Sequence, residues 1–177
     1  LQVTEGSEWM PQTTKNENTI QFNYFMGDQL INIKYRDGRK NFKLYKGAEK
    51  VFYNINSVVG YDWCVVVEGE MDVLALHEAG VKNAISVPNG ATLNSNNLDY
   101  LDNCIDYLDD KVKIVLAVDA DEAGQALRQE FIRRLGAEVC FLVDFNGQKD
   151  ANEYLVENGA AALRDAIHAA TQVPLEG

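Results

Sequence analysis

The pattern of apolar and polar residues in the first third of the chain is that of short β-strands. Runs rich in aromatic and β-branched residues, such as Gln21–Phe25 and Leu30–Tyr35, are separated by Met26–Gln29 and by Asp37-Gly38. Such runs joined by short Gly- and Asp-containing turns are typical of antiparallel hairpins. We therefore predict a small antiparallel β subdomain over residues 19–58. Residues 1–18 are polar and lack periodicity, so we expect them to be an irregular lead-in.

Beyond Gly60 the pattern changes to continuous apolar runs that alternate with segments of helical spacing. This alternation predicts an α/β fold, in which a mostly parallel sheet is flanked by helices in a Rossmann-like arrangement over residues 59–177. We expect strands at 63–67, 84–87, 112–118 and 138–143. We expect helices at 70–79, 93–108, 121–135, 152–158 and 160–170.

The charge of the chain limits how it could bind nucleic acid. The formal net charge of −11 argues against a domain that holds nucleic acid by overall electrostatic attraction, because phosphate binding needs clustered cations. Between Lys34 and Lys50, however, seven basic residues stand against two acidic ones. We therefore expect a local basic patch beside an acidic site, which would suit the handling of nucleotides.

Cysteine and histidine usage argues against a zinc site, because the three cysteines and two histidines are isolated from one another. Cys64 and Cys140 lie in apolar runs, so reduced cysteines and a cytoplasmic location are expected. No run of eighteen apolar residues occurs and the first residues lack a signal peptide, so we expect no membrane partner. The chain begins with Leu rather than Met, so we expect a fragment of something longer.

Acidic residues follow three of the expected apolar strands. Glu68 follows the first, Asp119 and Asp121 follow the third, and Asp150 comes a few residues after the fourth. Ligands of open α/β sheets bind at the carboxyl ends of the strands, so Glu68, Asp119 and Asp121 should converge there. Grouped carboxylates repel one another unless a cation lies between them, and oxygen ligands suit Mg²⁺ or Mn²⁺. We therefore predict a metal site, with Asp150 assisting.

Simpler roles exist for some of these residues. Asp121 and Asp150 could act as helix N-caps. Three further acidic residues fit best as first-turn residues that complement a helix dipole: Glu70, Asp72 and Glu122. Gly69 would let the backbone approach a phosphate closely. The loop Pro88–Thr92 is a tight polar segment expected at the same edge of the sheet.

Two longer segments resemble the Toprim family. The segment around Val65–Ala79, with Glu-Gly-Glu-Met-Asp at 68–72, is similar to its glutamate motif, and residues 113–136, with Asp-Ala-Asp at 119–121, are similar to its D-x-D motif. The resemblance covers about residues 60–157. It implies a Toprim fold in which Glu68, Asp119 and Asp121 are catalytic residues and metal ligands.

Two shorter matches point to the primases of phage-type primase–helicases and their Twinkle relatives. Lys149–Glu153 resembles their K-D-A-N-E element, and Lys34–Phe42 resembles their K-x-R-x(3)-K-N-F element. The second match implies that basic residues contact nucleotide or primer phosphates: Lys34 and Lys40, with Arg36 and Lys43 less directly. These lysines could instead be the solvated face of the β subdomain, where they would block edge pairing.

The resemblance implies a DNA primase catalytic domain that joins ribonucleoside triphosphates into primers on single-stranded DNA, with Mg²⁺ or Mn²⁺ as cofactor and a replicative helicase as partner. The sequence contains neither the cysteine cluster of a zinc ribbon nor a G-x-x-x-x-G-K-[ST] motif, so template reading and unwinding are not assigned to it. Two alternatives stay open: a Toprim nuclease, and a non-catalytic scaffold that binds DNA or a helicase. The basic element favours the primase, and the intact carboxylates disfavour the scaffold.

Overall fold

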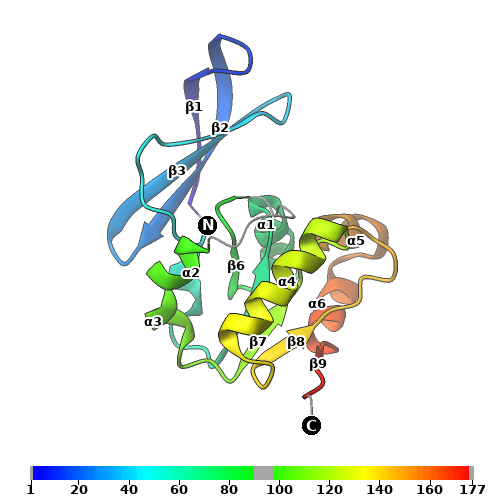
Figure 1. Ribbon diagram of the computed structural model, residues 1–177. Helices are drawn as coiled ribbons and strands as arrows, with labels where there is room; N and C mark the ends of the chain where they lie inside the picture. The colour runs from blue at the N-terminus through cyan, green and yellow to red at the C-terminus, as the bar shows by residue number, and fades with distance from the viewer. Residues whose placement is uncertain (1, 90–97, 176–177) are drawn as a thin grey trace.

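The structure is a computed structural model that describes residues 2–89 and 98–175. Within these residues a four-stranded antiparallel sheet is followed by a five-stranded, mostly parallel sheet. Figure 1 shows the antiparallel sheet standing above the α/β part of the molecule. The predicted fold class is therefore confirmed.

The antiparallel sheet has its strands in chain order: β1 (Val3–Met10), β2 (Lys15–Met26), β3 (Gln29–Asp37) and β4 (Phe42–Leu44). The prediction of an irregular lead-in over residues 1–18 is wrong, because β1 pairs with β2 along its whole length. Only Met10 of β1 is buried, so this strand carries almost no apolar signal. Its backbone hydrogen bonds to β2 hold it in place, and these cannot be seen in a hydrophobic pattern.

The second sheet has the order β6-β5-β7-β8-β9. Its strands are β5 (Trp63–Val67), β6 (Ala84–Ser86), β7 (Lys113–Leu116), β8 (Cys140–Leu142) and β9 (Thr171–Gln172). The first four are parallel to one another, as predicted, and β9 is antiparallel to β8. The strand β9 was not predicted, because two exposed residues give no periodic signal.

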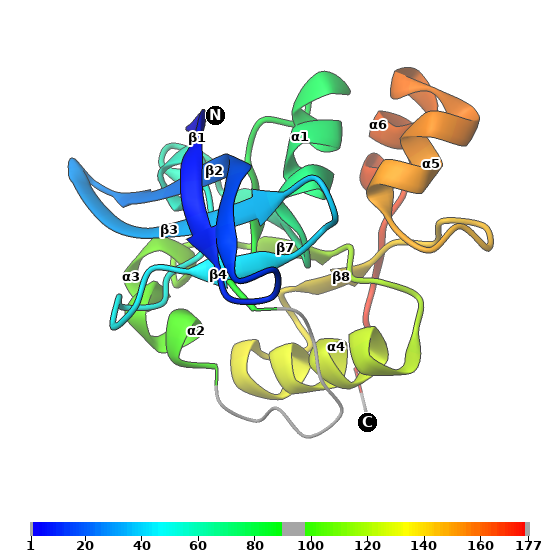
Figure 2. The same ribbon diagram turned by 90° about the horizontal axis from the view of Figure 1, so that it is seen from above.

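Helices cover both faces of the parallel sheet (Figure 2). Helices α1 (Glu70–Glu78), α5 (Ala151–Asn158) and α6 (Ala160–His168) contact one another on one face. On the other face lie α2 (Asp99–Asn103), α3 (Ile105–Leu108) and α4 (Glu122–Leu135). The single helix expected over 93–108 is divided at Cys104, and residues 93–97 lie outside the described residues.

The two sheets share one apolar core. Phe22 and Tyr24 of the antiparallel sheet pack against Tyr53, with ring centroids 5.7 and 5.3 Å apart respectively. Tyr53 in turn pairs with Ser86 of β6 as an isolated antiparallel bridge. A 3₁₀ helix, η1 (Ile55–Val58), completes the connection to β5. The buried residues on both sides of residue 58 belong to this one core. The domain boundary expected between residues 58 and 59 therefore stays a prediction.

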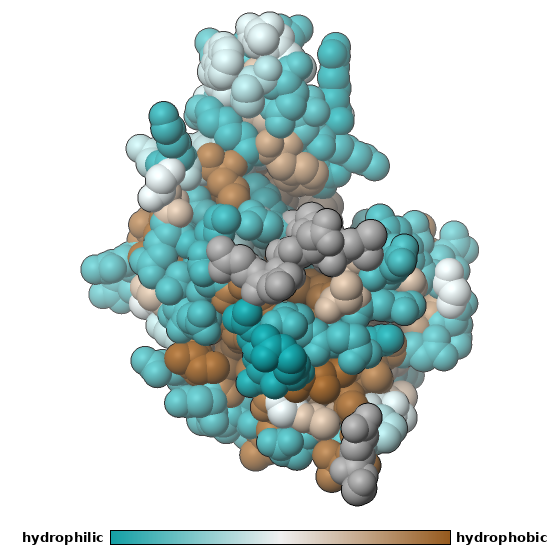
Figure 3. All heavy atoms as spheres, viewed as in Figure 1, coloured by the Kyte–Doolittle hydropathy of each residue, from teal (hydrophilic) through white to brown (hydrophobic). Residues whose placement is uncertain are grey.

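The surface of the face seen in Figure 3 is mostly hydrophilic, with scattered apolar atoms. The three cysteines are buried and unpaired, as expected for reduced thiols in apolar surroundings. Among the residues that the structure describes, no helix has the length and apolar character needed to cross a membrane.

Candidate active site

A cavity of about 740 Å³ lies between the two sheets. This size falls in the range of roughly 300–1,000 Å³ that is usual for small-molecule sites. Loops at the carboxyl ends of the parallel strands and the first turn of α1 supply its acidic residues, and β3 and β4 supply most of its basic ones. The charged lining residues are Lys34, Arg36, Lys43, Glu68, Glu70, Asp72, Asp119, Asp121, Lys149 and Asp150.

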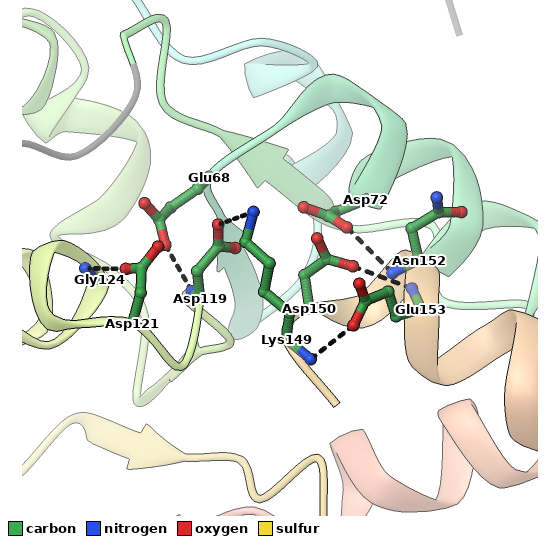
Figure 4. Close-up of polar contacts among 9 residues, drawn as sticks. All are labelled: Glu68, Asp72, Asp119, Asp121, Gly124, Lys149, Asp150, Asn152 and Glu153. Carbon is green, nitrogen blue, oxygen red and sulfur yellow. Dashed lines mark hydrogen bonds and ion pairs between the residues drawn. The ribbon is translucent and has the colours of Figure 1, made fainter. Parts of the chain in front are cut away.

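Three carboxylates meet on the acidic side of the cavity. One oxygen from each of Asp72, Asp119 and Asp150 lies within 4.8 Å of the other two. Figure 4 shows the three side chains reaching the same space from α1, from the loop after β7 and from the loop before α5. A backbone amide holds Asp72 in this position, since Asn152 N donates to Asp72 Oδ1 at 3.0 Å.

The pKa values of two of these carboxyls are raised. Burial, followed by the charge of Asp150, raises the pKa of Asp72 to about 7. Burial also raises the pKa of Asp119, and the charges of Glu68, Asp72 and Asp150 add to this effect. Lys149 opposes the shift, with its Nζ 4.0 Å from Asp119 Oδ2. Without a cation, these groups therefore resist carrying their charges together.

The residues fit a divalent cation. Asp119 Oδ1 is buried and has no hydrogen-bond partner among the described residues. A buried oxygen without a partner is costly, and a cation bound between the carboxylates would satisfy it. The donors are all carboxylate oxygens, which Mg²⁺ and Mn²⁺ favour over the nitrogen and sulfur ligands of zinc. Asp72, Asp119 and Asp150 could hold such an ion.

Glu68 contacts the loop that carries Asp119 rather than joining this group of three. It lies just beyond β5, and its Oε2 accepts a hydrogen bond from the backbone N–H of Asp119. Gly124 of α4 makes this approach possible, because a Cβ atom there would lie 2.1 Å from Asp119 O and 2.9 Å from Glu68 Oε2. The predicted convergence of Glu68, Asp119 and Asp121 at one edge of the sheet therefore agrees with their positions.

Asp121 and Asp150 both act as helix N-caps, the simpler role considered for each. Asp121 Oδ1 accepts from Gly124 N at 2.7 Å, and Asp150 Oδ1 accepts from Glu153 N at 2.9 Å. A cap uses one carboxylate oxygen, so the other stays available. Their roles as metal ligands stay predictions.

The roles predicted for Gly69 and for the loop Pro88–Thr92 are not tested. Gly69 is the N-cap of α1 in an extended conformation, and an added Cβ would make only an ordinary 3.5 Å contact with Asp72. Its backbone conformation therefore does not require glycine. Pro88 and Asn89 line the cavity, whereas residues 90–92 lie outside the described residues.

The basic residues predicted to bind phosphate differ in their surroundings. Lys34 lies in the cavity wall, with its Nζ 2.6 Å from Glu70 Oε1. Arg36 also lines the cavity, where its Cζ lies 5.7 Å from the centroid of the Phe42 ring. Both residues project from the same face of β3, since they are two positions apart.

Of the other two predicted residues, Lys43 lines the cavity and Lys40 does not. Lys43 Nζ is already bound, at 2.6 Å from Glu8 Oε1 and 2.8 Å from Trp9 O. Lys40 is exposed after the β3–β4 turn and does not line the cavity. Lys34 and Lys43 both line the cavity and are both paired with a carboxylate, whereas Lys40 lies outside it, so phosphate contacts by Lys40 have the least structural support.

Three charged residues of the cavity are not among the predicted site residues: Glu70, Asp72 and Lys149. Glu70, expected only as a first-turn residue of α1, pairs with Lys34. Asp72 was interpreted as a first-turn helix residue, which it is, but it also faces the other carboxylates. Its position one turn after Glu68 was the available signal. Lys149 was noted only as part of the K-D-A-N-E element, and no periodicity could show that its ammonium group reaches Asp119.

Comparison with known proteins places the chain in a family. The Toprim-like family matches residues 65–155, just over half of the 177 residues. The chain belongs to the Toprim-like family. The matched segment runs from β5 to α5 and contains every acidic residue that lines the cavity, so the resemblance inferred from the two acidic motifs is confirmed.

Two plant proteins are similar to nearly the whole chain. A "Primase homolog protein" of Arabidopsis thaliana is 36% identical over 97% of this chain. The "Twinkle homolog protein, chloroplastic/mitochondrial" of the same plant is 34% identical over 98%. This chain spans 56% and 27% of the lengths of these relatives.

The fold matches that of a solved primase fragment, from the bacteriophage T7 primase-helicase protein. The TM-score is 0.73 at 23% identity, over 92% of this chain and 65% of that one. At this level of identity the similarity concerns the fold.

Proposed function

We propose that this Toprim-like chain is the catalytic domain of a DNA primase, which uses a divalent cation to join ribonucleoside triphosphates into a short RNA primer on single-stranded DNA. The observation that carries the proposal is the pairing, across one cavity, of the carboxylates Asp72, Asp119 and Asp150 with the cations Lys34 and Arg36. The names of the two plant relatives support it.

In this reaction the 3′-hydroxyl of one ribonucleotide attacks the α-phosphate of a nucleoside triphosphate, a new P–O bond forms, and pyrophosphate leaves. A bound Mg²⁺ or Mn²⁺ would neutralise phosphate charge and make the hydroxyl easier to deprotonate. Asp72, Asp119 and Asp150 would hold that cation. Asp121 would contribute its second oxygen from the start of α4.

Other charged residues of the cavity would position the reactants. Lys34, Arg36 and Lys149 would bind the negatively charged phosphates from two sides of the cavity, which lowers the electrostatic cost of bringing phosphate and carboxylates together. Glu68 would fix the loop of Asp119 through its backbone N–H, and could accept the proton of the attacking hydroxyl.

Single-stranded DNA and ribonucleoside triphosphates are the proposed substrates, and a helicase is the proposed partner. The Twinkle relative and the name of the phage primase-helicase support the helicase partner. The cytoplasmic location stays a prediction, since one relative is named chloroplastic/mitochondrial.

The test is synthesis on single-stranded DNA with labelled ribonucleotides and Mg²⁺ or Mn²⁺, beside an Asp119→Asn variant. The proposal expects short labelled oligoribonucleotides from the parent chain and none from the variant. Shortened DNA without labelled products would show a nuclease instead. DNA binding without either reaction would show a scaffold, and either result would overturn the proposal.

A further inference from the structure

We propose that Phe42 and Arg36 form a stacking shelf for a nucleobase at the wall of the cavity that faces the carboxylates. The ligand class is a purine or pyrimidine ring, supplied by a nucleoside triphosphate or by a DNA strand. The inference rests on the proposed function and deepens it, because it assigns a surface for the base directly beside the cations proposed to bind the phosphates, with Arg36 contacting both.

The Phe42 side chain is an exposed apolar ring in a cavity that many charged residues line. Its exposed fraction is 46%, whereas Phe22, on the same wall, is fully buried. Exposing an aromatic ring costs free energy unless a ligand covers it. The ring offers a flat apolar surface beside charged groups, and this is the kind of surface on which bases stack.

Strand register places the guanidinium group next to this ring. Arg36 of β3 is directly opposite Phe42 of β4, and its Cζ lies 5.7 Å from the ring centroid. Lys34 Nζ lies 5.6 Å from the same centroid. Bases stack on guanidinium planes as well as on aromatic rings, so Arg36 and Phe42 together extend the surface available to a base.

The turn before Phe42 is held rigidly. The Asp37 carboxylate accepts three hydrogen bonds, from Arg39 N, Asn41 N and Asn41 Nδ2, each at 2.9 Å. Gln12 Nε2 donates to Phe42 O at 2.8 Å from the β1–β2 turn. A ring presented by a fixed backbone loses little entropy when a base stacks on it, which favours a binding role.

The acidic wall of the cavity, opposite the shelf, would receive the phosphates of the same nucleotide. There the carboxylates would hold the cation of a triphosphate and Lys149 would meet its phosphates, while Lys34 would reach them from the β3 side. One nucleotide could thus contact the acidic wall through its phosphates and the Phe42–Arg36 shelf through its base. Tyr45 provides the comparison, because it is 58% exposed three residues further on but does not line the cavity.

The experiment measures binding in Mg²⁺ by calorimetry, with ATP, ribose 5-triphosphate and single-stranded DNA as probes. Ribose 5-triphosphate carries the phosphates without the base. The proteins are the parent chain, Phe42→Ala, Phe42→Trp and the control Tyr45→Ala, and a thermal melt of each reports its folding.

If the shelf binds the base of the nucleoside triphosphate, Phe42→Ala weakens ATP binding about ten-fold and changes ribose 5-triphosphate binding less than two-fold, and Phe42→Trp restores ATP binding. If the shelf binds a base of the DNA, Phe42→Ala weakens the binding of single-stranded DNA about ten-fold and Phe42→Trp restores it. Equal losses for both triphosphates, no loss for any probe, or no binding by the folded parent chain would overturn the shelf. Primer synthesis, assayed separately, reports on the proposed function whichever pattern is found.

Discussion

Lys34 Nζ lies 2.6 Å from Glu70 Oε1, and this ion pair joins β3 of the antiparallel sheet to α1, the first helix that covers the parallel sheet. Both side chains are largely buried, with exposed fractions of 10% and 4%. The Tyr24 hydroxyl donates to the same Glu70 oxygen. Burial raises the pKa of Tyr24, and the neighbouring Glu70 charge adds to this, so the phenol stays a donor.

Breaking this pair on one side is expected to destabilise the protein strongly, because the remaining charge is left buried without a partner. Glu70→Gln should lower the free energy of unfolding by about 3 kcal/mol. Urea denaturation measures the loss. Lys43→Met is the matched control, since it removes a more exposed pair with Glu8 and should cost less than about 1 kcal/mol. Equal effects of the two variants would contradict the structural role given to Glu70.

Removing the charge of Asp119 should separate the destabilisation that the grouped carboxylates cause from their contribution to cation binding. Asp119→Asn is expected to raise the free energy of unfolding of the metal-free protein by on the order of 1 kcal/mol, since like charges within 4.8 Å repel. Mg²⁺ at a hundred times its dissociation constant should stabilise the parent by about 2.7 kcal/mol and the variant much less. Thermal melts with and without Mg²⁺ measure both effects.

Glu157→Gln is the control for this prediction, because Glu157 is an exposed acid of α5. It should leave the stabilisation by Mg²⁺ unchanged. A parent chain that Mg²⁺ does not stabilise would count against the carboxylates as a cation site.

Gly124 should not tolerate a larger side chain. In Gly124→Ala the new Cβ would meet Asp119 O at 2.1 Å, so the loop of Asp119 or the helix α4 must shift. We expect a loss of primer synthesis of at least ten-fold, because small displacements of reacting groups cost rate steeply. Gly38→Ala is the matched control, since nothing lies within 4 Å of its Cβ position. Full activity of Gly124→Ala would show that the contact between Glu68 and Asp119 N is dispensable.

The two roles of Asp121 can be separated by substitution. Asn caps helices as well as Asp does, so Asp121→Asn should preserve the stability of α4, whereas Asp121→Ala should lose about 1 kcal/mol. If Asp121 also binds the cation, both variants lose primer synthesis. Urea denaturation beside the primer assay decides, and an active Asp121→Asn would leave the residue as a helix cap alone.

The sequence by itself determined the α/β class, most elements of the parallel sheet and the edge at which the acidic residues gather. Apolar strands such as Trp63–Val67 and the helix that ends before Gly136 follow from local composition and periodicity. Because parallel strands end at the same edge, the positions of Glu68, Asp119 and Asp121 after two such strands were enough to predict that they lie close together.

Only the tertiary structure decided which carboxylates share one space and which carboxylate each cation pairs with. Asp72 joins Asp119 and Asp150 because α1 packs beside α5, and this contact spans about eighty residues of chain. Lys34 and Lys43 look alike in the sequence, yet one pairs with Glu70 in the cavity and the other with Glu8. Burial, long-range pairing and strand register determine these partners, and none of the three can be predicted from the local pattern of residues.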